Sequence, residues 1–468
     1  MERLLIRVPA TYQSERAYIL TVVLHQWLGL DFDMALKDDI GWVEISLSAN
    51  NIKALRLNDN LFQTETQSWL KIQSLPVQPL PKWKVDVKEI RELLVTPDIP
   101  VIFGNLLKNS SYVDIEEDII ELGIDILGSA FFMLTRYEEY IEPERDLHDR
   151  FPASASLAYQ EGFLDRPIIN EYIEILWWCL NRLWPGLARK KRRFRTIVSH
   201  DIDVPFAQAF SSTTQLIRNC IGDIVRRRSL YLAMQRTQSW QAVKKGDYKQ
   251  DLNYTFDRIM DISEINNLKS AFYFKTACTN KTYDNNYSIK HPYIRKLIKD
   301  IHNRGHEIGF HPSYETYLNW SRLKGEFDKL LEVCEQEGIQ QSQWGGRQHY
   351  LRWRVPQTWR SWADIGLNYD STLTYVEHAG FRCGVCYEYQ TFDLEQSRPL
   401  SLFEYPLIIM DGSILEKQNM DLGGNEAVEY IMKLKRRCQQ FQGQFTHLWH
   451  NNIFTDIKIW QTYEALLK

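Results

Sequence analysis

Residues 195–203 read "RTIVSHDID", an apolar strand-like run that ends abruptly in His200, Asp201 and Asp203. Two carboxylates two positions apart are unfavourable inside a buried strand, but they are expected where a functional site lies at the end of a strand. In an extended chain residues i and i+2 point to the same face, so both aspartates enter one pocket. Neighbouring carboxylates raise each other's pKa unless a cation lies beside them. The motif therefore predicts either a metal site, with one carboxylate as ligand and the other as base, or a pair of surface aspartates.

The chain after residue 194 alternates strand-like and helix-like segments. Strand candidates occur at residues 194–201, 269–276, 306–311, 344–350, 403–409 and 445–451, and helices are expected between them at 254–268 and 293–305. This alternation implies parallel strands and hence an α/β barrel or an open α/β sheet. In such folds functional residues gather at the carboxyl ends of the strands. The polar residues at those ends predict one shared site; they are Asp201, Asp203, His311, Arg347 and His450.

The stretch "RGHEIGFHPSYETY" places a second polar residue type at a strand end. His306 and His311 are five positions apart, which does not fit the spacing of a helical zinc pair. His311 directly follows the short strand "EIGF". A neutral imidazole there is a good ligand for Zn²⁺ or Co²⁺, and a hydrogen-bonded structural histidine is the alternative.

Together these segments resemble the polysaccharide deacetylase (NodB-homology) family of carbohydrate esterases. The first family motif is a strand that ends in a catalytic Asp and a metal-binding Asp, similar to "SHDID". The second is a strand followed by a metal-binding His, similar to "GHEIGFH". "LKSAFYF" lies between them and resembles another family strand. The resemblance covers residues 194–455 and implies a distorted (β/α) barrel, joined here to an additional N-terminal α/β domain.

Two later segments complete the resemblance. "GGRQHYLRW" lies where the family has an Arg that orients the catalytic Asp, and Arg347 is the matching residue. "FTHLWHNN" resembles the last family motif, in which His450 matches the catalytic acid, with His447 as the alternative.

One position departs from the family pattern. The family has a second metal-binding His four residues after the first, and this chain has Glu315 there. A carboxylate is an accepted zinc ligand, so Asp203, His311 and Glu315 form one candidate ligand set. Alternatively His349 or His200 supplies the missing ligand, or the protein binds metal weakly and is catalytically inactive.

The resemblance implies hydrolysis of an N-acetyl or O-acetyl group on a sugar with a divalent metal, most simply zinc. Asp201 then acts as the base, Arg347 keeps it ionised and oriented, and His450 protonates the departing group. Hydroxyl, carboxylate and aromatic groups suit a sugar, and they make four further residues candidates for substrate binding: His349, Tyr350, Asp370 and Trp449.

The N-terminal part of the chain is expected to fold separately. Residues 1–110 read as a small α/β domain, residues 111–193 as a helical connecting region that includes a helix over 114–141, and residues 194–468 as the catalytic domain. The last carries an insertion at about residues 206–250, which is long for a connection between a strand and a helix. We expect this insertion to cap the site, with Arg226, Arg227 and Arg228 near an anionic group of the substrate.

Composition narrows the class of protein. The net charge of −4 is unlike that of a nucleic-acid binder. The seven cysteines include a single CxxC pair, Cys383 and Cys386, so no zinc ribbon is expected and the thiols fit a reduced compartment. No secretory signal or stretch of 18 apolar residues occurs, so we expect a cytoplasmic protein without a transmembrane span. The sequence leaves the oligomeric state open.

Three functions compete at this point. The first is an active metal-dependent sugar deacetylase in surface polysaccharide biosynthesis, acting on an acetylated sugar or polysaccharide precursor. The second is a catalytically degenerate relative that binds glycan or scaffolds a biosynthetic complex. The third is a hydrolase of another C–N bond on the same scaffold.

Overall fold

The computed structural model describes residues 3–38, 40–48, 50–108, 110–284, 287–454 and 456–468. The chain divides into two compact units, each of which is discontinuous in sequence. Unit 1 comprises Met1–Arg195, Trp353–Ile408 and Lys433–Phe445, and unit 2 comprises Thr196–Arg352, Ile409–Met432 and Thr446–Lys468. The predicted boundaries near residues 110 and 193 stay predictions.

Unit 1 contains a mixed six-stranded sheet in the order β2-β1-β3-β4-β8-β7. Its strands are β1 (Leu4–Val8), β2 (Phe32–Leu36), β3 (Trp42–Leu47), β4 (Asn50–Asn58), β7 (Val113–Ile115) and β8 (Ile119–Leu122). The pairs β1–β2 and β4–β8 are parallel, and the pairs β1–β3, β3–β4 and β7–β8 are antiparallel. Unit 1 also holds a β5–β6 pair (Lys82–Lys84, Asp98–Pro100) and the strands β13 (Tyr369–Asp370), β14 (Tyr389–Asp393) and β15 (Arg398–Glu404).

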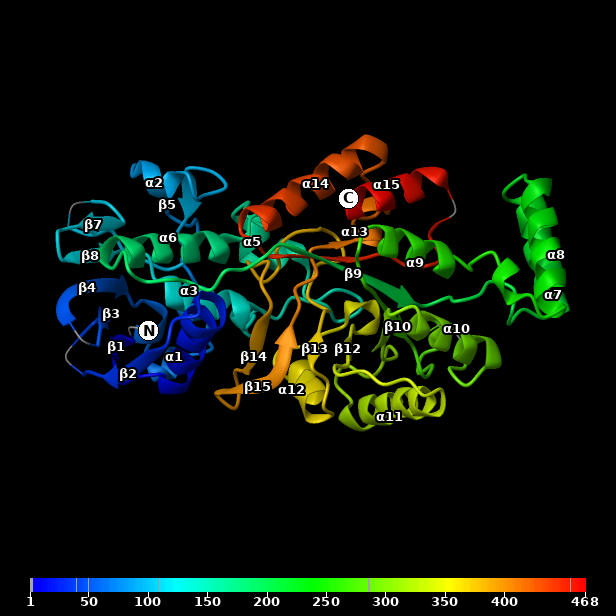
Figure 1. Cartoon of the computed structure of the whole chain (residues 1–468), viewed down its shortest axis with the longest axis horizontal. Coiled ribbons are helices and arrows are strands. Elements are labelled where there is room, and N and C mark those ends of the chain that lie inside the picture. Colours follow the sequence, from blue (N-terminus) through cyan, green and yellow to red (C-terminus); the bar gives the residue numbers. More distant parts are fainter. Residues whose placement is uncertain (1–2, 39, 49, 109, 285–286, 455) are drawn as a thin grey trace. The chain divides into compact units, whose positions relative to one another are not determined.

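The helices of unit 1 pack mainly through apolar faces. They are α1 (Gln13–Leu20), which continues as a π-helix over Thr21–Leu28, α2 (Lys88–Arg91), α3 (Ile126–Leu134), α4 (Tyr137–Ile141), α5 (Leu157–Gln160), α6 (Ile168–Leu183) and α12 (Gln357–Asp364). Every residue of α3 is buried, and α6 packs on α3, β4 and β8 (Figure 1). Helix α14 (Gly424–Gln440) begins in unit 2 and ends in unit 1.

The helix predicted over residues 114–141 is wrong in its first half. Residues 113–122 form the β7–β8 hairpin, and the helices begin only at Ile126. The acidic run Glu116–Asp118 lies at the turn, while β8 pairs in parallel with β4 and buries Ile120 and Leu122. The sheet edge provided by β4 thus outweighs the helical pattern of the local sequence.

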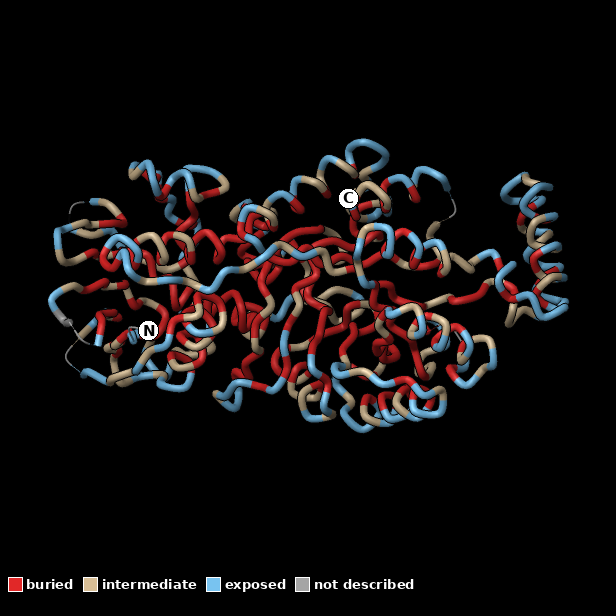
Figure 2. Tube along the Cα trace, viewed as in Figure 1, coloured by how far each residue is buried: buried red, intermediate tan, exposed pale blue. Residues whose placement is uncertain are grey.

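Unit 2 is an α/β unit with a curled, half-barrel sheet in the order β12-β11-β10-β9-β17-β16. Its strands are β9 (Arg195–Ile202), β10 (Ser270–Phe274), β11 (Glu307–Phe310), β12 (Gly345–Gly346), β16 (Ile409–Met410) and β17 (Gln444–Leu448). The pairs β9–β10, β10–β11, β11–β12 and β16–β17 are parallel. Figure 2 shows these strands buried over most of their length, as the strands of a parallel sheet covered by helices are.

The helices of unit 2 are α7 (Thr213–Val225), α8 (Leu230–Lys244), α9 (Phe256–Ile265), α10 (Pro292–Asn303), α11 (Trp320–Gln336), α13 (Asp411–Leu415) and α15 (Ile457–Leu467). Helices α9 and α10 lie between strands, as the sequence predicts, and α11 is a further helix between β11 and β12. Helices α7 and α8 form a helical hairpin within the insertion (Figure 1). The single strand predicted over residues 403–409 is instead two, because β15 ends at Glu404 and β16 begins at Ile409. Pro406 lies between them and cannot donate a ladder hydrogen bond. No helix within the described residues is long and apolar enough to cross a membrane.

Candidate metal centre

Three side chains that follow β9, β11 and β12 meet in unit 2. Asp203 follows β9, His311 follows β11, and His349 begins a short 3-10 helix after β12. The Asp203 Oδ1 atom lies 3.1 Å from His349 Nε2 and 3.4 Å from His311 Nε2. One ligand atom from each of the three residues lies within 4.8 Å of those of the other two, a spacing that a single metal ion spans. Two imidazoles and one carboxylate are a donor set that zinc accepts.

The backbone of the parallel sheet places these residues. The His311 amide donates to the Phe274 carbonyl at 3.0 Å, and the Arg347 amide donates to the Phe310 carbonyl at 3.1 Å. Gly346 passes so close to β11 that a Cβ atom there would lie 1.8 Å from the Phe310 oxygen. The glycine therefore permits the close approach that brings the residues after β12 to the end of β11.

Both histidines are oriented by a hydrogen bond on the nitrogen that faces away from Asp203. His311 Nδ1 lies 2.6 Å from the Arg347 carbonyl, which only accepts, so Nδ1 carries the proton and Nε2 turns toward Asp203. His349 Nδ1 lies 2.8 Å from Asp284 Oδ1, a carboxylate that is itself fully buried. Such outer partners are typical of metal-binding histidines, since they hold the ring and raise its basicity.

The electrostatics of the group favour a cation at its centre. His311 Nε2 and Asp203 Oδ1 are buried, and neither has a hydrogen-bond partner among the described residues. Burial alone would raise the pKa of Asp203, but the positive charges of His349 and Lys275 and the neighbouring His311 hold that pKa well below its usual value. The carboxylate oxygen of Asp203 and the imidazole nitrogen of His311 face each other, an arrangement that a divalent cation between them would stabilise further. The residues present therefore fit a divalent metal.

A buried lysine lies at the same place. Lys275 directly follows β10, its side chain is 1% exposed, and its Nζ atom lies 3.4 Å from Asp203 Oδ1. Nζ has no hydrogen-bond partner among the described residues. The ammonium partly compensates the charge of Asp203 in the absence of a metal, and it would repel a metal beside it.

Asp201 lies next to this group in a setting suited to a base. Arg347 Nη1 donates to Asp201 Oδ1 at 2.7 Å, and Arg347 Nη2 donates to Ser199 Oγ at 2.9 Å. Asp201 Oδ2 lies 3.8 Å from His311 Nε2, and both Asp201 and Arg347 are buried. One oxygen of Asp201 is thus held by a charge-assisted bond while the other points toward the candidate ligands.

His450 approaches from the end of β17 and is held by an aspartate from the end of β16. Asp411 accepts from the backbone N–H of His450 at 2.7 Å and from its Nδ1 at 2.8 Å. His450 Nε2 lies 3.6 Å from Asp203 Oδ2. Burial by itself would lower the pKa of His450, but Asp411, together with Asp203 and Asp201, raises it to about 10. At neutral pH this imidazole therefore holds a proton that it could donate.

The structure places several other predicted residues away from this group. The Glu315 side chain is 38% exposed, lies 3.6 Å from Arg352 Nη1 and accepts from Asn280 at 3.4 Å. His200 occupies the opposite face of β9, where Nδ1 contacts the Trp449 carbonyl at 2.6 Å and Nε2 the Tyr463 hydroxyl at 3.2 Å. Burial lowers the pKa of His200 to about 4, as expected for a neutral core histidine.

Of the predicted substrate-binding residues, some lie beside the candidate metal centre and others lie away from it. Tyr350 is partly exposed, and its ring centroid lies 4.9 Å from that of His349. Trp449 is completely buried and packs against Tyr463, with ring centroids 5.9 Å apart. Asp370 belongs to unit 1, where it is buried and accepts from the Thr372 amide at 3.0 Å.

Three residues of the group were not predicted from the sequence: Asp284, Asp411 and Lys275. Asp411 follows the apolar run "PLIIM", and Lys275 follows "SAFYF", so the strand-end argument that found Asp203 applies to both. Asp284 lies in a loop and has no comparable signal in the sequence. It also accepts from the backbone amides of Thr279 and Asn280, and these contacts fix the loop in place.

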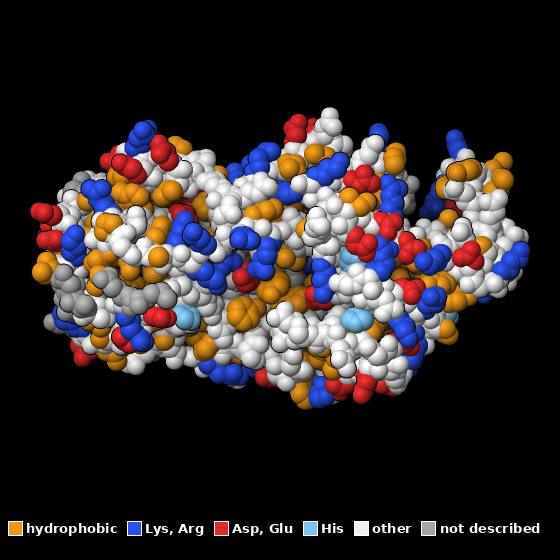
Figure 3. Space-filling model, viewed as in Figure 1, with side chains coloured by type: hydrophobic (Ala, Val, Ile, Leu, Met, Phe, Trp, Pro, Cys, Tyr) orange, Lys and Arg blue, Asp and Glu red, His pale blue; other side chains and the backbone are white. Residues whose placement is uncertain are grey.

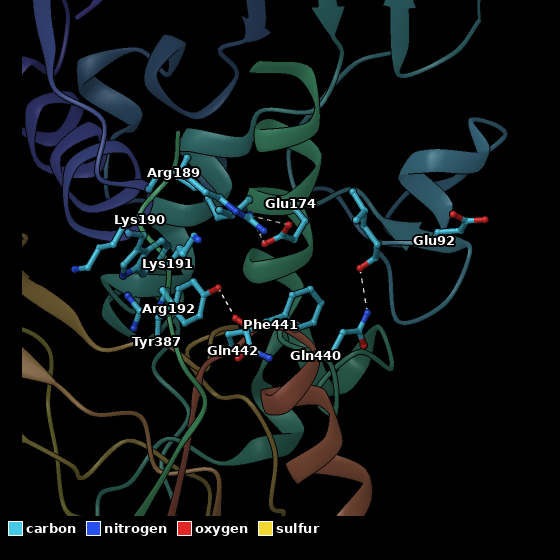
Figure 4. Close-up of a pocket in the computed structure, with 14 residues that line it drawn as sticks. Glu92, Glu174, Arg189, Lys190, Lys191, Arg192, Tyr387, Gln440, Phe441 and Gln442 are labelled. Carbon is cyan, nitrogen blue, oxygen red and sulfur yellow. Dashed lines mark hydrogen bonds and ion pairs between the residues drawn. The ribbon is translucent and has the colours of Figure 1, made fainter. Parts of the chain in front are cut away.

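A separate cavity of about 460 Å³ lies within unit 1 (Figure 4). Its lining includes the run Arg189–Arg192 but no histidine or cysteine. Arg189 is paired with Glu174 at 2.7 Å, and Arg192 lies over the Tyr387 ring at 4.0 Å. This lining lacks a set of metal ligands, and the strand ends of unit 2 remain the candidate site.

Comparison with protein families gives a match to the N-terminal part of the chain. Residues 4–185 match the model of a family of unknown function (DUF7033). No curated protein matches the chain.

Solved structures give weak similarities. A putative polysaccharide deacetylase from Mycobacterium smegmatis is 13% identical with a TM-score of 0.38, over 59% of this chain and 84% of that one. Puue allantoinase is 11% identical with a TM-score of 0.36, over 61% and 85%. A probable polysaccharide deacetylase from Pseudomonas aeruginosa PAO1 is 12% identical with a TM-score of 0.35, over 67% and 90%. At these identities and TM-scores the similarities assign neither a fold family nor an activity to the chain.

Proposed function

We propose that unit 2 is a metal-dependent hydrolase that removes an acetyl group from a sugar. The observation that carries this proposal is the meeting of Asp203, His311 and His349 beside an Arg347-bound Asp201 and an Asp411-bound His450. Ligands, a base and an acid at one edge of a parallel sheet are the components that hydrolysis of an amide or ester needs.

In this proposal Asp203, His311 and His349 hold the metal, and Glu315 is not a ligand. His349 is one of the two histidines that the sequence offers in place of the missing family ligand, and His200 is already bonded through both ring nitrogens. The donor set of two nitrogens and one oxygen favours zinc. When bound, the metal would polarise the acetyl carbonyl and acidify a water molecule.

The remaining residues move the protons. Asp201 takes a proton from the attacking water through the oxygen that Arg347 does not hold. Arg347 keeps Asp201 ionised and fixes its orientation through the 2.7 Å bond. His450 donates the proton on Nε2 to the departing amine or alcohol, because Asp411 holds Nδ1. An amine leaves poorly without that proton.

The substrate is assigned from chemistry and from the resemblance of the motifs to polysaccharide deacetylases. Tyr350, partly exposed beside His349, offers an aromatic face on which a pyranose ring can stack. An acetylated sugar or polysaccharide precursor, used in surface polysaccharide biosynthesis, fits both the chemistry of the site and the resemblance of the motifs.

The substitution Asp201→Asn tests the base. Asparagine keeps the size of the side chain but cannot take a proton, so turnover of an acetylated amino-sugar oligomer should fall by about 10²–10⁴-fold. Zinc should remain bound in the ratio found for the native chain, measured by elemental analysis. Asp328→Asn, on the exposed face of α11, is the matched control. Undiminished turnover in Asp201→Asn would exclude this role.

One observation favours a second candidate function, a degenerate relative that binds glycan. The Lys275 ammonium lies 3.4 Å from Asp203 and supplies a positive charge from the chain itself. If it replaces the metal, the native protein binds no zinc after reconstitution but still binds acetylated oligosaccharides. Stoichiometric zinc would exclude this candidate.

A further inference from the structure

The α7–α8 hairpin in the insertion exposes an unusual number of apolar side chains. Eight large hydrophobic residues between Ile217 and Met234 are 37–69% exposed, more than a third of all such residues in the described part of the chain. In α7 they are Ile217, Ile221, Ile224 and Val225, which share one face at helical spacing. The face that a helix normally buries is therefore turned to solvent here.

The hairpin does not need this face for its own folding. Asp223 is 1% exposed and pairs with Arg236 of α8 at 2.7 Å and with Arg227 at 2.8 Å. Leu216 and Ala233 are buried on the inner side. Ser212 and Ser229 cap the two helices by accepting backbone N–H groups at 3.2 Å. The exposed stripe is thus additional to a hairpin that is already closed.

Positive charge surrounds the apolar stripe. Residues 213–245 contain seven Lys and Arg residues against a single acid, Asp223, whereas the whole chain has a net charge of −4. Three consecutive arginines, 226–228, form the turn between the helices, next to Val225 and Leu230. Figure 3 shows hydrophobic side chains beside Lys and Arg on this projecting hairpin.

Two of these three arginines, Arg226 and Arg227, line a groove. It has a volume of about 740 Å³ and is bordered by Arg218, Arg226, Arg227, Arg236, Ile221 and Val225. Cationic and apolar groups side by side match the boundary between lipid headgroups and acyl chains. The exposed Tyr231 and the long arginine side chains suit that boundary, because each has an apolar body and a polar end.

We propose that the tip of the α7–α8 hairpin docks on an anionic lipid bilayer, inserting Val225, Leu230 and Tyr231 between headgroups that the arginines contact. The complementarity of charge selects this partner, since each cation near an anionic membrane surface strengthens binding. The binding is reversible and peripheral. It would hold unit 2 at a membrane surface, and it is independent of the metal centre.

Sedimentation of the full chain with vesicles tests the proposal. The protein should pellet with phosphatidylcholine vesicles that contain 30% phosphatidylglycerol and remain in solution with pure phosphatidylcholine. Binding should weaken several-fold as salt is raised, because screening reduces the attraction to the charged surface. Failure to bind the anionic vesicles would overturn the proposal.

Two variants separate the apolar and the charged contributions. Val225→Asp/Tyr231→Asp and Arg218→Glu/Arg226→Glu change exposed positions only, and each should weaken vesicle binding at least about tenfold. Ile457→Asp and Lys458→Glu, exposed on α15, are the matched controls and should bind as the native chain does. Equal binding by the hairpin variants would overturn the assignment of the surface.

Two other outcomes would assign the hairpin to a different role. If Val225→Asp/Tyr231→Asp converts a dimer into a monomer without affecting sedimentation, the stripe binds a second copy of the chain. If the arginine variant raises KM for a soluble substrate but leaves vesicle binding intact, the hairpin caps the active site. The metal and turnover assays are carried out without lipid. A negative result for the proposed activity is therefore distinct from a negative result for membrane binding.

Discussion

At the scale of single residues, a position at the end of a strand identifies candidate site residues. The conformation of the loop that follows the strand then decides which of them face the candidate metal site. The sequence offers Glu315, His349 and His200 as alternatives for the third metal ligand. The backbone after β12 turns through a left-handed residue, Tyr350 at φ 60°, and His349 points to Asp203. Glu315 lies beside Arg352 instead. Loop conformation of this kind depends on distant contacts, such as the bond from His349 to Asp284.

Lys275 gives the first prediction at this scale. Lys275→Met removes a positive charge from beside the candidate metal ligands and leaves an uncharged side chain of similar length in a buried position. Zinc should bind at least about tenfold more tightly, since repulsion between like charges is strong at this range. A competition titration against a chromophoric chelator measures the affinity.

Lys281→Met, at an exposed position six residues further on, is the control and should leave zinc affinity unchanged. Equal or weaker zinc binding by Lys275→Met would show that the lysine does not oppose the metal.

At the scale of elements, a buried network of charges in unit 1 fixes α4 to the segment around Arg382. Glu139 accepts from Arg136 at 2.8 Å and from Arg382 Nη2 at 2.6 Å, and all three side chains are at most 2% exposed. Although burial by itself would raise the pKa of Glu139, Arg382 and Arg136 lower it to about 2. The network joins segments more than 240 residues apart in sequence and stabilises their packing within unit 1.

Glu139 predicts how the stability of unit 1 depends on pH. Because the pKa falls from 4.5 in the unfolded chain to about 2 in the folded one, its contribution is complete above pH 4.5 and is lost as pH falls toward 2. Glu139→Gln should reduce the free energy of unfolding at pH 7 by roughly 3 kcal/mol and flatten its decline on acidification. Urea unfolding between pH 7 and pH 3 measures both effects.

Glu117→Gln, at an exposed position in the same unit, should behave as the native chain does. A variant at 139 whose stability falls with acid in parallel with the native chain would contradict the assignment of this pKa.

At the scale of the whole molecule, the two units are built from interleaved stretches of chain, yet all three candidate ligands belong to unit 2. A metal that binds only folded unit 2 stabilises that unit by mass action. Zinc at 100 times its Kd should add about 2.7 kcal/mol to the free energy of unfolding and raise Tm by roughly 5–10 °C. Differential scanning calorimetry with and without zinc measures the shift.

His311→Ala should abolish this shift because it removes one of three ligands. His25→Ala, which removes an exposed histidine from unit 1, should retain it. A zinc-induced shift that persists in His311→Ala would place the metal elsewhere.

The sequence by itself determined what depends on local pattern. Apolar runs punctuated by polar residues located β9, β10, β11 and β17 and the strand ends that carry Asp201, Asp203, His311, Arg347 and His450. This succeeds because parallel strands place their carboxyl ends on one edge of a sheet, whatever the loops between them do.

Only the tertiary structure decided which further groups complete the site. It brought Asp284 and Lys275 to the candidate ligands and Asp411 to His450, buried Trp449 in the core and turned residues 113–122 into a hairpin beside β4. Each of these outcomes depends on contacts between residues far apart in the chain. The free energy of these contacts exceeds the local preference of each segment for one type of secondary structure. The pattern of residues along a single segment therefore does not predict them.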